Sequence, residues 1–465
     1  MKRKIVFWGA GRIGVRAVNF VHEAGFKIDN FCDNQNEKIG TIIVGVKVIS
    51  FAQLMQKKNV TDIYITAAAY EQIEYQLKNA GVKIECIHIF NSLPYWVKWL
   101  NERENNMVDW YIKPRSVLFE LSNGLALGGI ERWCFQEAER LKKNDFDVHI
   151  MVEDKKNEIL HPNNQMLYKY PNCDGLSDYE KLRMSQKYII ESHAEIFIAD
   201  SGSINFYAAC MVAAQVRNFK IIAVVHSDEP NYYKSYTVLQ RYISSLFVIS
   251  KKIYFRYLSL GFESNKIHFL PWCIENTGGN HKYSSEDTEL RIGYAGRVVY
   301  EVKRMDKIVD IAKILRMKGI DFQIDIAGQG NDTAALHDMI KKNDLEKAIH
   351  LVGFLSSDDV HKFWHEKDIM ISCSEYEGHS ITQCEAMEAG AVPIATDVSG
   401  VGDDIIDGQN GYLVDVDDSV NQIVSKIEDI YYDRKRLKIL GDNARQIIHE
   451  KYTKENVMKL WNSVL

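Results

Sequence analysis

The sequence lacks the features that define several special classes of protein. No apolar run approaches the ~20 residues that a helix needs to cross a bilayer, and no C-x-x-C pair stands among the eight cysteines. Cysteines scattered in this way favour reduced thiols over a disulfide framework or a zinc site. The formal net charge of -6 argues against a nucleic-acid-binding protein, whose footprint is usually basic. We therefore expect a cytoplasmic protein with no nucleic-acid partner.

What is present is an ordinary globular composition, with 46% apolar and 26% charged residues. A chain of 465 residues is too long for one hydrophobic core, and about 100–200 residues per domain suggests three domains. The start, "MKRKIVFWGAGRIG", joins a basic tip to a short apolar run. That run ends at glycines and leads into an amphipathic helix pattern, so we predict a strand rather than a signal peptide.

Short β-rich runs alternate with helical patterns almost throughout, which predicts an α/β protein with parallel sheets. Connecting stretches, such as the polar "ENTGGNHKYSSEDTE", divide these runs into three series. We predict a small Rossmann-like domain, a tryptophan-rich connecting helix whose aromatic residues pack between domains, and two larger sheet domains. The last helix is expected to pack back on the second domain. The predicted bounds are 1–90, 91–115, 116–275 and 288–465.

The stretch "SEYEGHSITQCEAMEAG" at 374–390 follows an apolar run, "DIMISC", that is typical of a strand buried on both faces. Ser380 and Gln383 fit a capping box, which predicts Ser380 as the N-cap of a helix. Gly390 supplies the C-terminal stop. The helix then begins at the carboxyl edge of a parallel sheet, where its free amides form a ready site for a phosphate.

Two carboxylates flank this helix N-terminus. Glu377 precedes the helix and Glu385 lies inside it, so each can accept paired hydrogen bonds from the vicinal hydroxyls of a sugar. The alternative is a solvated glutamate pair on an ordinary helix. Arg297 and Lys303 stand where a diphosphate would need countercharges, although Arg304 directly follows Lys303 and leaves that assignment open by one position.

Small residues stand at several other predicted strand ends, where they let a nucleotide approach the backbone. Two of them belong to a glycine turn in the second domain that could close over the diphosphate. The candidate residues of this kind, with one neighbouring aromatic, are Gly128, Gly129, Gly328, Gly330, Gly353 and Phe354.

Together these motifs, with "EAMEAGAVPIATDVSG" and "DGQNGYLV", resemble the family 4 glycosyltransferases of GT-B fold over roughly residues 116–465. The resemblance implies two Rossmann-like domains facing across a cleft, one for the acceptor and one for the donor. It implies retaining transfer of a sugar from a nucleotide diphosphate sugar, with a UDP-sugar favoured, to an acceptor hydroxyl. Bacterial surface polysaccharide or glycoconjugate synthesis is the expected setting, with a saccharide or lipid-linked acceptor.

The resemblance also implies roles for individual residues. Glu377 would hold hydroxyls of the donor sugar, and Glu385 would hold the ribose. The leaving diphosphate would be stabilised without any metal ion or other cofactor, and the groups expected to do this are Arg297, Lys303 and the backbone amides of Ser380 and Ile381.

Two histidines extend the expected site. His226 ends a predicted strand in "AVVHSDEP", where the resemblance implies a histidine facing the donor sugar; the alternative is a residue that caps a loop. His379 occupies a loop position that is often apolar in the family, and either tunes the choice of donor sugar or is exposed. The "DVD" stretch at 415–417 follows a strand and is interpreted as a solvated turn rather than a metal site.

A second glycine pattern opens the chain. Gly9, Gly11 and Gly14 lie between a predicted strand and helix, and Asp33 follows about 20 residues later, as in dinucleotide-binding Rossmann units. An NAD-dependent oxidoreductase is therefore one alternative function. The unit resembles more closely the small nucleotide-binding modules attached to bacterial sugar-modifying acyltransferases and methyltransferases. A UDP-sugar, NAD or no ligand all stay open, and we favour a regulatory or assembly module.

A third alternative is a non-catalytic sensor of nucleotide sugars, which the four charged residues Arg297, Lys303, Glu377 and Glu385 argue against. Peripheral contact with the inner face of the membrane and self-association are left open by the sequence.

Overall fold

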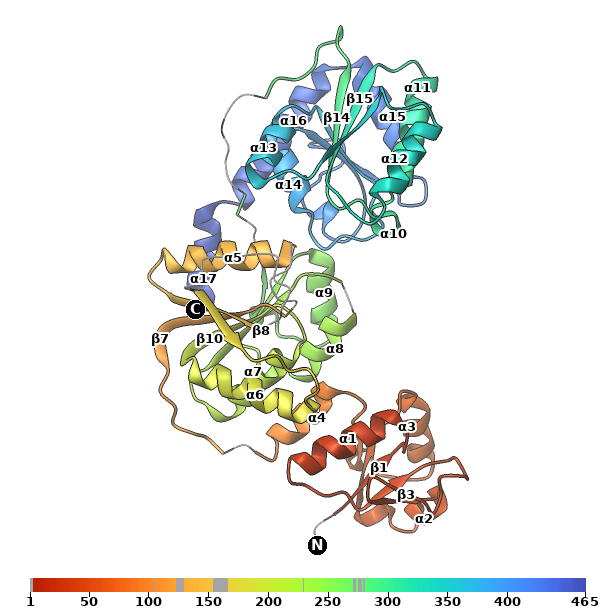
Figure 1. The fold of residues 1–465 in the computed structure, drawn as a ribbon, viewed down its shortest axis with the longest axis vertical. Helices are drawn as coiled ribbons and strands as arrows, with labels where there is room; N and C mark the ends of the chain where they lie inside the picture. The colour runs from red at the N-terminus through yellow and green to blue at the C-terminus, as the bar shows by residue number, and fades with distance from the viewer. Residues whose placement is uncertain are drawn as a thin grey trace. The chain divides into compact units, whose positions relative to one another are not determined.

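A computed structural model describes residues 3–104, 106–122, 129–153, 166–228, 230–270, 273–274, 278 and 281–465 (Figure 1). The chain divides into two compact units. The first comprises Met1–Val224 and Pro230–Leu246, and the second comprises Val225–Glu229 and Phe247–Leu465. Three largely parallel sheets are distributed over these units, which confirms the predicted α/β class. Within the described residues no helix has the length and apolarity needed to span a bilayer.

The first sheet has the strand order β3-β4-β2-β1-β5-β6, and its pairs are parallel except for the β3–β4 hairpin. Its strands are β1 (Lys4–Trp8), β2 (Asn30–Cys32), β3 (Ile42–Ile43), β4 (Val46–Ile49), β5 (Thr61–Ile65) and β6 (Ile87–Ile89). The helices of this region are α1 (Arg12–Glu23), α2 (Phe51–Met55) and α3 (Tyr70–Asn79). Because β1 is central, the turn that follows it lies between the carboxyl ends of β2 and β5.

The predicted connecting segment contains helix α4 (Leu93–Asn101), whose Trp96 and Trp99 are buried, whereas Trp110 and Tyr111 further along the segment are exposed. Trp96 packs with its ring centroid 5.5 Å from that of Phe20 in α1, and Trp99 lies 5.0 Å from Phe26. Asn101 donates a hydrogen bond to the carbonyl oxygen of Cys210 at 3.1 Å. These two tryptophans therefore pack against neighbouring elements of the first unit.

The second sheet has the order β13-β12-β11-β10-β7-β8-β9. Its strands are β7 (Lys113–Glu120), β8 (Asp147–Glu153), β9 (Leu167–Tyr170), β10 (Ala194–Ala199), β11 (Lys220–Val225), β12 (Ser245–Val248) and β13 (Ile267–Phe269). Its helices are α5 (Gly129–Lys142), α6 (Asp178–Glu191), α7 (Ile204–Gln215), α8 (Pro230–Val238) and α9 (Lys251–Ser259). The central strands are almost wholly apolar and buried, as expected for a sheet covered on both faces.

The third sheet is entirely parallel, with the order β16-β15-β14-β17-β18-β19. Its strands are β14 (Leu290–Ala295), β15 (Phe322–Ala327), β16 (Ile349–Gly353), β17 (Ile369–Ser372), β18 (Val392–Thr396) and β19 (Tyr412–Val414). Its helices are α10 (Tyr300–Lys303), α11 (Met305–Met317), α12 (Thr333–Lys342), α13 (Ser357–His365), α14 (Ile381–Ala389), α15 (Ser419–Tyr432) and α16 (Lys435–Lys451). Helices α11, α12 and α15 cover one face, and α13, α14 and α16 cover the other (Figure 1).

The last helix, α17 (Lys454–Val464), contacts a strand of the second sheet. Trp461 is fully buried, and its ring centroid lies 5.2 Å from that of Phe247 in β12. Both residues belong to the second unit. A large buried aromatic pair of this kind fixes the helix through apolar contact.

Candidate functional site

The centre of the candidate site is the N-terminus of α14, which follows the fully buried strand β17. Ser380 is the N-cap, and its hydroxyl oxygen accepts a hydrogen bond from the Gln383 amide at 3.3 Å. Gly390 ends the helix with φ +98°, a conformation that favours glycine. The reciprocal half of the predicted capping box is wrong. Gln383 is buried, and its side chain instead donates to the carbonyl oxygen of Val401 at 3.2 Å.

Glu377, in the loop before α14, is held by two side chains. The Ser374 hydroxyl donates to Glu377 Oε1 at 2.9 Å, and Lys303 Nζ forms an ion pair with the same oxygen. The Lys303 and Glu377 side chains are only 17% and 13% exposed, so water screens this pair weakly. Ser374 itself is buried. An acid and a cation are thus fixed beside a helix N-terminus.

Lys303 and the adjacent Arg304 bind different carboxylates. Arg304 adopts a left-handed conformation with φ +50° between α10 and α11. Its guanidinium binds Asp306 at 2.8 Å and also pairs with Glu375. The Glu375 amide donates to the carbonyl oxygen of Val302 at 2.9 Å, which ties the Glu377 loop to α10. Because Arg304 is committed to two carboxylates, Lys303 is the cation that reaches Glu377.

Arg297 lies at the carboxyl end of β14, next to Gly296. Its side chain is exposed and forms no ion pair within the described residues. Its carbonyl oxygen accepts a hydrogen bond from the Tyr294 hydroxyl at 2.9 Å, which fixes the backbone of the turn. An arginine in this setting can turn to an anionic ligand without breaking an internal contact.

The glycines after β15 serve the packing of the chain itself. A Cβ on Gly328 would lie 1.8 Å from the carbonyl oxygen of Gly296, and one on Gly330 would lie 2.1 Å from that of Val298. The turns after β14 and β15 therefore touch backbone to backbone, which gives these glycines a packing role; that they let a nucleotide approach the backbone stays a prediction. A Cβ on Gly353, with φ +83°, would meet only the Gln329 side chain at 3.9 Å, and the adjacent Phe354 is 69% exposed.

The remaining candidate residues for donor binding lie in α14 and at the start of α5. Glu385 is buried inside α14, one turn beyond Ile381, which is half-buried at the first helical position. Gly129 is the first residue of α5. Gly128 lies outside the described residues.

His226 directly follows β11 and groups with the second unit. Burial lowers the pKa of its imidazole to about 3, so the ring is neutral at physiological pH. A Cβ on Gly378 would lie 2.6 Å from the carbonyl oxygen of His226. Gly400, with φ +81°, packs in turn against the carbonyl oxygen of Gly378. Sequence reasoning missed Gly378, although its place directly after Glu377 was a usable signal.

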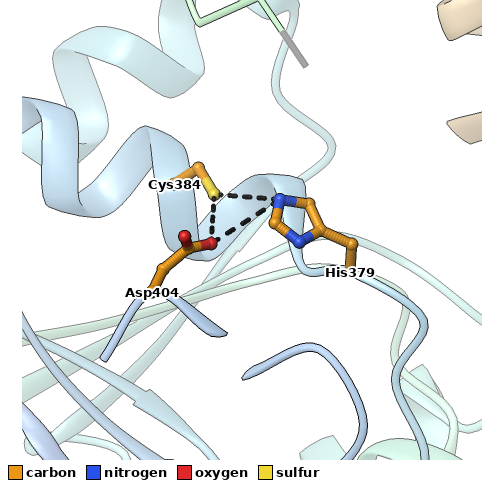
Figure 2. A group of neighbouring side chains, drawn as sticks. All are labelled: His379, Cys384 and Asp404. Carbon is orange, nitrogen blue, oxygen red and sulfur yellow. Dashed lines mark hydrogen bonds and ion pairs between the residues drawn. The ribbon is translucent and has the colours of Figure 1, made fainter. Parts of the chain in front are cut away.

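His379 is not exposed, which rules out one of the two expectations for it. Its side chain is 4% exposed, and its Nε2 points toward Cys384 and Asp404 (Figure 2). The imidazole is directed into the interior of the second unit, so the side chain itself is engaged with protein groups.

The glycine pattern near the start of the chain borders a cavity of about 440 Å³. Gly9 adopts φ +117°, Gly11 is the N-cap of α1, and Gly14 packs against the carbonyl oxygen of Gly9. The Asp33 carboxylate accepts hydrogen bonds from the amides of Ala10 and Gln35, each at 2.9 Å. The acid expected to bind a ribose therefore already ties its own loop to the glycine turn after β1.

Two buried acids in the first unit were not predicted. Glu120 ends β7, and Asp200 follows the neighbouring strand β10. Glu120 accepts a hydrogen bond from the Ser203 hydroxyl, and Asp200 accepts one from the Ser122 amide at 3.0 Å. Burial raises the pKa of Glu120 and raises that of Asp200 to about 6. Their only sequence signal is an acid at the end of an apolar run.

Two family models match the chain. Residues 280–447 match the family described as "Glycosyl transferases group 1", and residues 1–88 match "C2185-like, N-terminal". The first match contains Arg297, Lys303, Glu377 and Glu385. The second contains the glycine pattern with Asp33.

Similar proteins agree with the first match. The chain is 29% identical over 175 residues to a poly(ribitol-phosphate) alpha-N-acetylglucosaminyltransferase of Staphylococcus aureus (strain COL). That match covers 37% of this chain and 35% of the relative, so the chain spans about a third of that protein's length. It is 23% identical over 360 residues to the capsular polysaccharide biosynthesis glycosyltransferase CapM of Staphylococcus aureus, covering 71% of this chain and 93% of CapM.

The fold is also similar to a solved structure. HepE of Anabaena, solved in complex with UDP and glucose, superposes with a TM-score of 0.60 at 14% identity. The superposition covers 75% of this chain and 98% of HepE. At this level of identity the likeness shows the fold, which is GT-B.

Proposed function

We propose that this protein, a glycosyltransferase of GT-B fold with a group 1 domain, transfers a sugar from a UDP-sugar to an acceptor hydroxyl and retains the anomeric configuration. The observation that carries the proposal is the Lys303–Glu377 pair beside the N-terminus of α14. The UDP bound by HepE supports the choice of base, and the role of CapM in capsule synthesis supports a saccharide or lipid-linked acceptor in bacterial surface polysaccharide.

The departing diphosphate gathers negative charge, and the site offers fixed groups to stabilise it. The first amides of α14 point toward the loop, and the helix dipole adds partial positive charge. Arg297 supplies a full positive charge from the carboxyl end of β14, and Lys303 supplies another from the short helix α10 that follows. Each well-placed donor is worth ~3 kcal/mol of the barrier, so these groups replace a divalent ion in the proposed mechanism.

Glu377 and Lys303 exchange partners when the donor binds. Without a donor, the Lys303 ammonium and the Glu377 carboxylate form an ion pair with each other. Hydroxyls of the donor sugar then donate to Glu377, while Lys303 turns to the diphosphate and Ser374 keeps the carboxylate in place. Glu385, one turn further into α14, accepts the ribose hydroxyls in this arrangement.

His226 acts as a neutral group in this proposal. Since burial holds its pKa near 3, the imidazole carries no charge at physiological pH and cannot serve as a cation for the diphosphate. It orients the donor sugar by hydrogen bonding. Because the ring is neutral, it does not repel the positive charge that develops on the sugar.

The test is a donor panel in which release of UDP and GDP is measured with an excess of EDTA and a saccharide acceptor. We expect UDP release, and we expect the anomeric proton coupling of the product to match that of the donor. Glu377→Gln should lower kcat about 100-fold. Saturable donor binding without release would instead favour a sensor, and NADH consumption would favour an oxidoreductase.

The cavity lined by Gly9, Gly11 and Asp33 supports a separate proposal, that residues 1–88 form a nucleotide-binding module. Because the Asp33 carboxylate is bonded to the amides of Ala10 and Gln35, we expect the ligand to be held chiefly by the amides at the start of α1. Equilibrium dialysis with UDP-sugars and NAD tests this module, since binding whose affinity is unchanged by Lys303→Met points to a site outside the group 1 domain.

A further inference from the structure

Three side chains converge in the interior of the second unit, close to the loop that carries Glu377. His379 precedes α14, Cys384 lies in its first turns, and Asp404 follows the short 3-10 helix Val401–Asp403. Figure 2 shows all three pointing toward one another. The His379 Nε2–Cys384 Sγ distance is 3.3 Å, Cys384 Sγ–Asp404 Oδ2 is 3.7 Å, and His379 Nε2–Asp404 Oδ2 is 3.8 Å.

These separations are those of atoms that share a tetrahedral metal ion. Zinc binds imidazole nitrogen, carboxylate oxygen and thiolate sulfur at about 2.0–2.3 Å, which places pairs of ligand atoms about 3.3–3.6 Å apart at tetrahedral angles. A mixed nitrogen, sulfur and oxygen set suits zinc, whereas magnesium and calcium prefer oxygen alone. We propose that His379, Cys384 and Asp404 bind one zinc ion, with water in the fourth position.

The surroundings of Asp404 favour this assignment. Lys451 Nζ binds Asp404 Oδ1 at 2.9 Å, and the Tyr452 hydroxyl lies 2.8 Å from each carboxylate oxygen. Such outer partners orient a carboxylate ligand and balance part of its charge. The carboxylate is thereby turned so that Oδ2 faces the histidine and the cysteine (Figure 2).

Burial gives the cluster a reason to hold an ion. Cys384 and Asp404 are each 1% exposed, and the His379 side chain is 4% exposed. Within the described residues His379 Nδ1 has no hydrogen-bond partner, but an ion on Nε2 would leave that atom unchanged, so the case for the ion rests on the three atoms that face one another. A cation bonded to Nε2, Sγ and Oδ2 would offset the cost of burying these polar atoms.

The ion would be structural, because its ligands join three segments of the second unit. It links the Glu377 loop, α14 and the segment after Gly400, and so would hold the N-terminus of α14 against its neighbours. This inference does not depend on the proposed transfer reaction, since metal content and stability are measured without any donor. It is also compatible with turnover in EDTA, because a buried structural ion is not the countercharge of the diphosphate.

The test is elemental analysis of the purified full chain, produced in zinc-supplemented medium and freed of loosely bound metal by gel filtration. We expect about one zinc per chain, and less than a fifth of that in Cys384→Ala and in His379→Phe. Cys373→Ala, which removes another buried cysteine of the same unit, is the matched control and should keep its zinc.

A second readout covers variants that fold poorly. Wild-type protein stripped with a strong chelator should lose several degrees of Tm and regain them when zinc alone is added back. Wild-type protein that is folded but contains no zinc, and whose Tm does not respond to added zinc, would overturn the proposal. Zinc retained at the wild-type level in Cys384→Ala would overturn it as well.

Discussion

The chain builds two glycine turns at the carboxyl ends of parallel strands, and the two differ in how their charged residues are used. In the first unit the Asp33 carboxylate accepts hydrogen bonds from the amides of Ala10, in the glycine turn, and Gln35, and pairs at 3.4 Å with Lys38, beside a cavity of about 440 Å³. In the second unit Glu377 is held by side chains, Ser374 and Lys303, that can turn to a ligand. A glycine turn before a helix is therefore a scaffold only, and chemistry needs charged side chains that can exchange partners.

Among the changes that test this difference, loss of the Glu377 charge should have the largest effect, which is a fall in kcat. In Glu377→Gln the sugar hydroxyls lose a charged acceptor and Lys303 loses its partner, so we expect kcat to fall about 100-fold, or ~3 kcal/mol. Steady-state UDP release measures this. Glu301→Gln, an exposed glutamate on α10, is the control and should keep wild-type rates. Equal rates for the two variants would remove Glu377 from the mechanism.

Disrupting the backbone contact between the turns after β14 and β15 should have the next largest effect, which is a loss of stability. Gly328→Ala places a Cβ 1.8 Å from the carbonyl oxygen of Gly296, at a φ of +135°, so we expect a loss of about 3 kcal/mol of unfolding free energy. Gly353→Ala, also at positive φ but with only an ordinary contact to the Gln329 side chain at 3.9 Å, should cost about 1 kcal/mol. Urea unfolding of both variants checks this order, and the reverse order would contradict it.

Ser374→Ala should sharpen the contrast by weakening the support of Glu377 without removing its charge. The loss of one hydrogen bond to a carboxylate, worth ~1 kcal/mol, should raise KM for the donor about fivefold and change kcat little. Donor titrations at saturating acceptor separate the two constants. A fall in kcat with KM unchanged would show that Ser374 acts elsewhere.

The buried acids of the first unit should give the smallest effect, visible only as pH dependence. Asp200 and Glu120 both have folded-state pKa values above their ordinary ones, so the folded chain binds more protons than the unfolded chain. Stability should therefore fall as pH rises from about 4 through about 6 and beyond. Glu120→Gln should flatten this fall and raise Tm at pH 8 more than at pH 5.

The control for that variant is Glu139→Gln, an exposed glutamate on α5, which should leave the pH profile unchanged. Thermal melts across pH 5 to 8 provide the comparison. If wild type and Glu120→Gln lose stability in parallel as pH rises, Glu120 is not a source of the effect.

Local patterns predicted much of this molecule, because strands and helix ends are set by nearby residues. The buried strand β17, the N-cap Ser380 and the stop at Gly390 all follow from apolar runs and capping chemistry. The choice of Lys303 over Arg304 could not be made from sequence, since it depends on the left-handed φ of Arg304 and on Glu375. The burial of His379 was likewise hidden, because Cys384 and Asp404 lie beside it only after folding.

Isothermal titration of UDP in the presence of EDTA tests the central claim most directly, because it asks which glycine turn holds the diphosphate. Wild type and Asp33→Asn should bind UDP with the same Kd, and Lys303→Met should bind it at least tenfold more weakly, since a full positive charge is lost beside the helix N-terminus. Loss of UDP affinity in Asp33→Asn together with wild-type affinity in Lys303→Met would contradict the account.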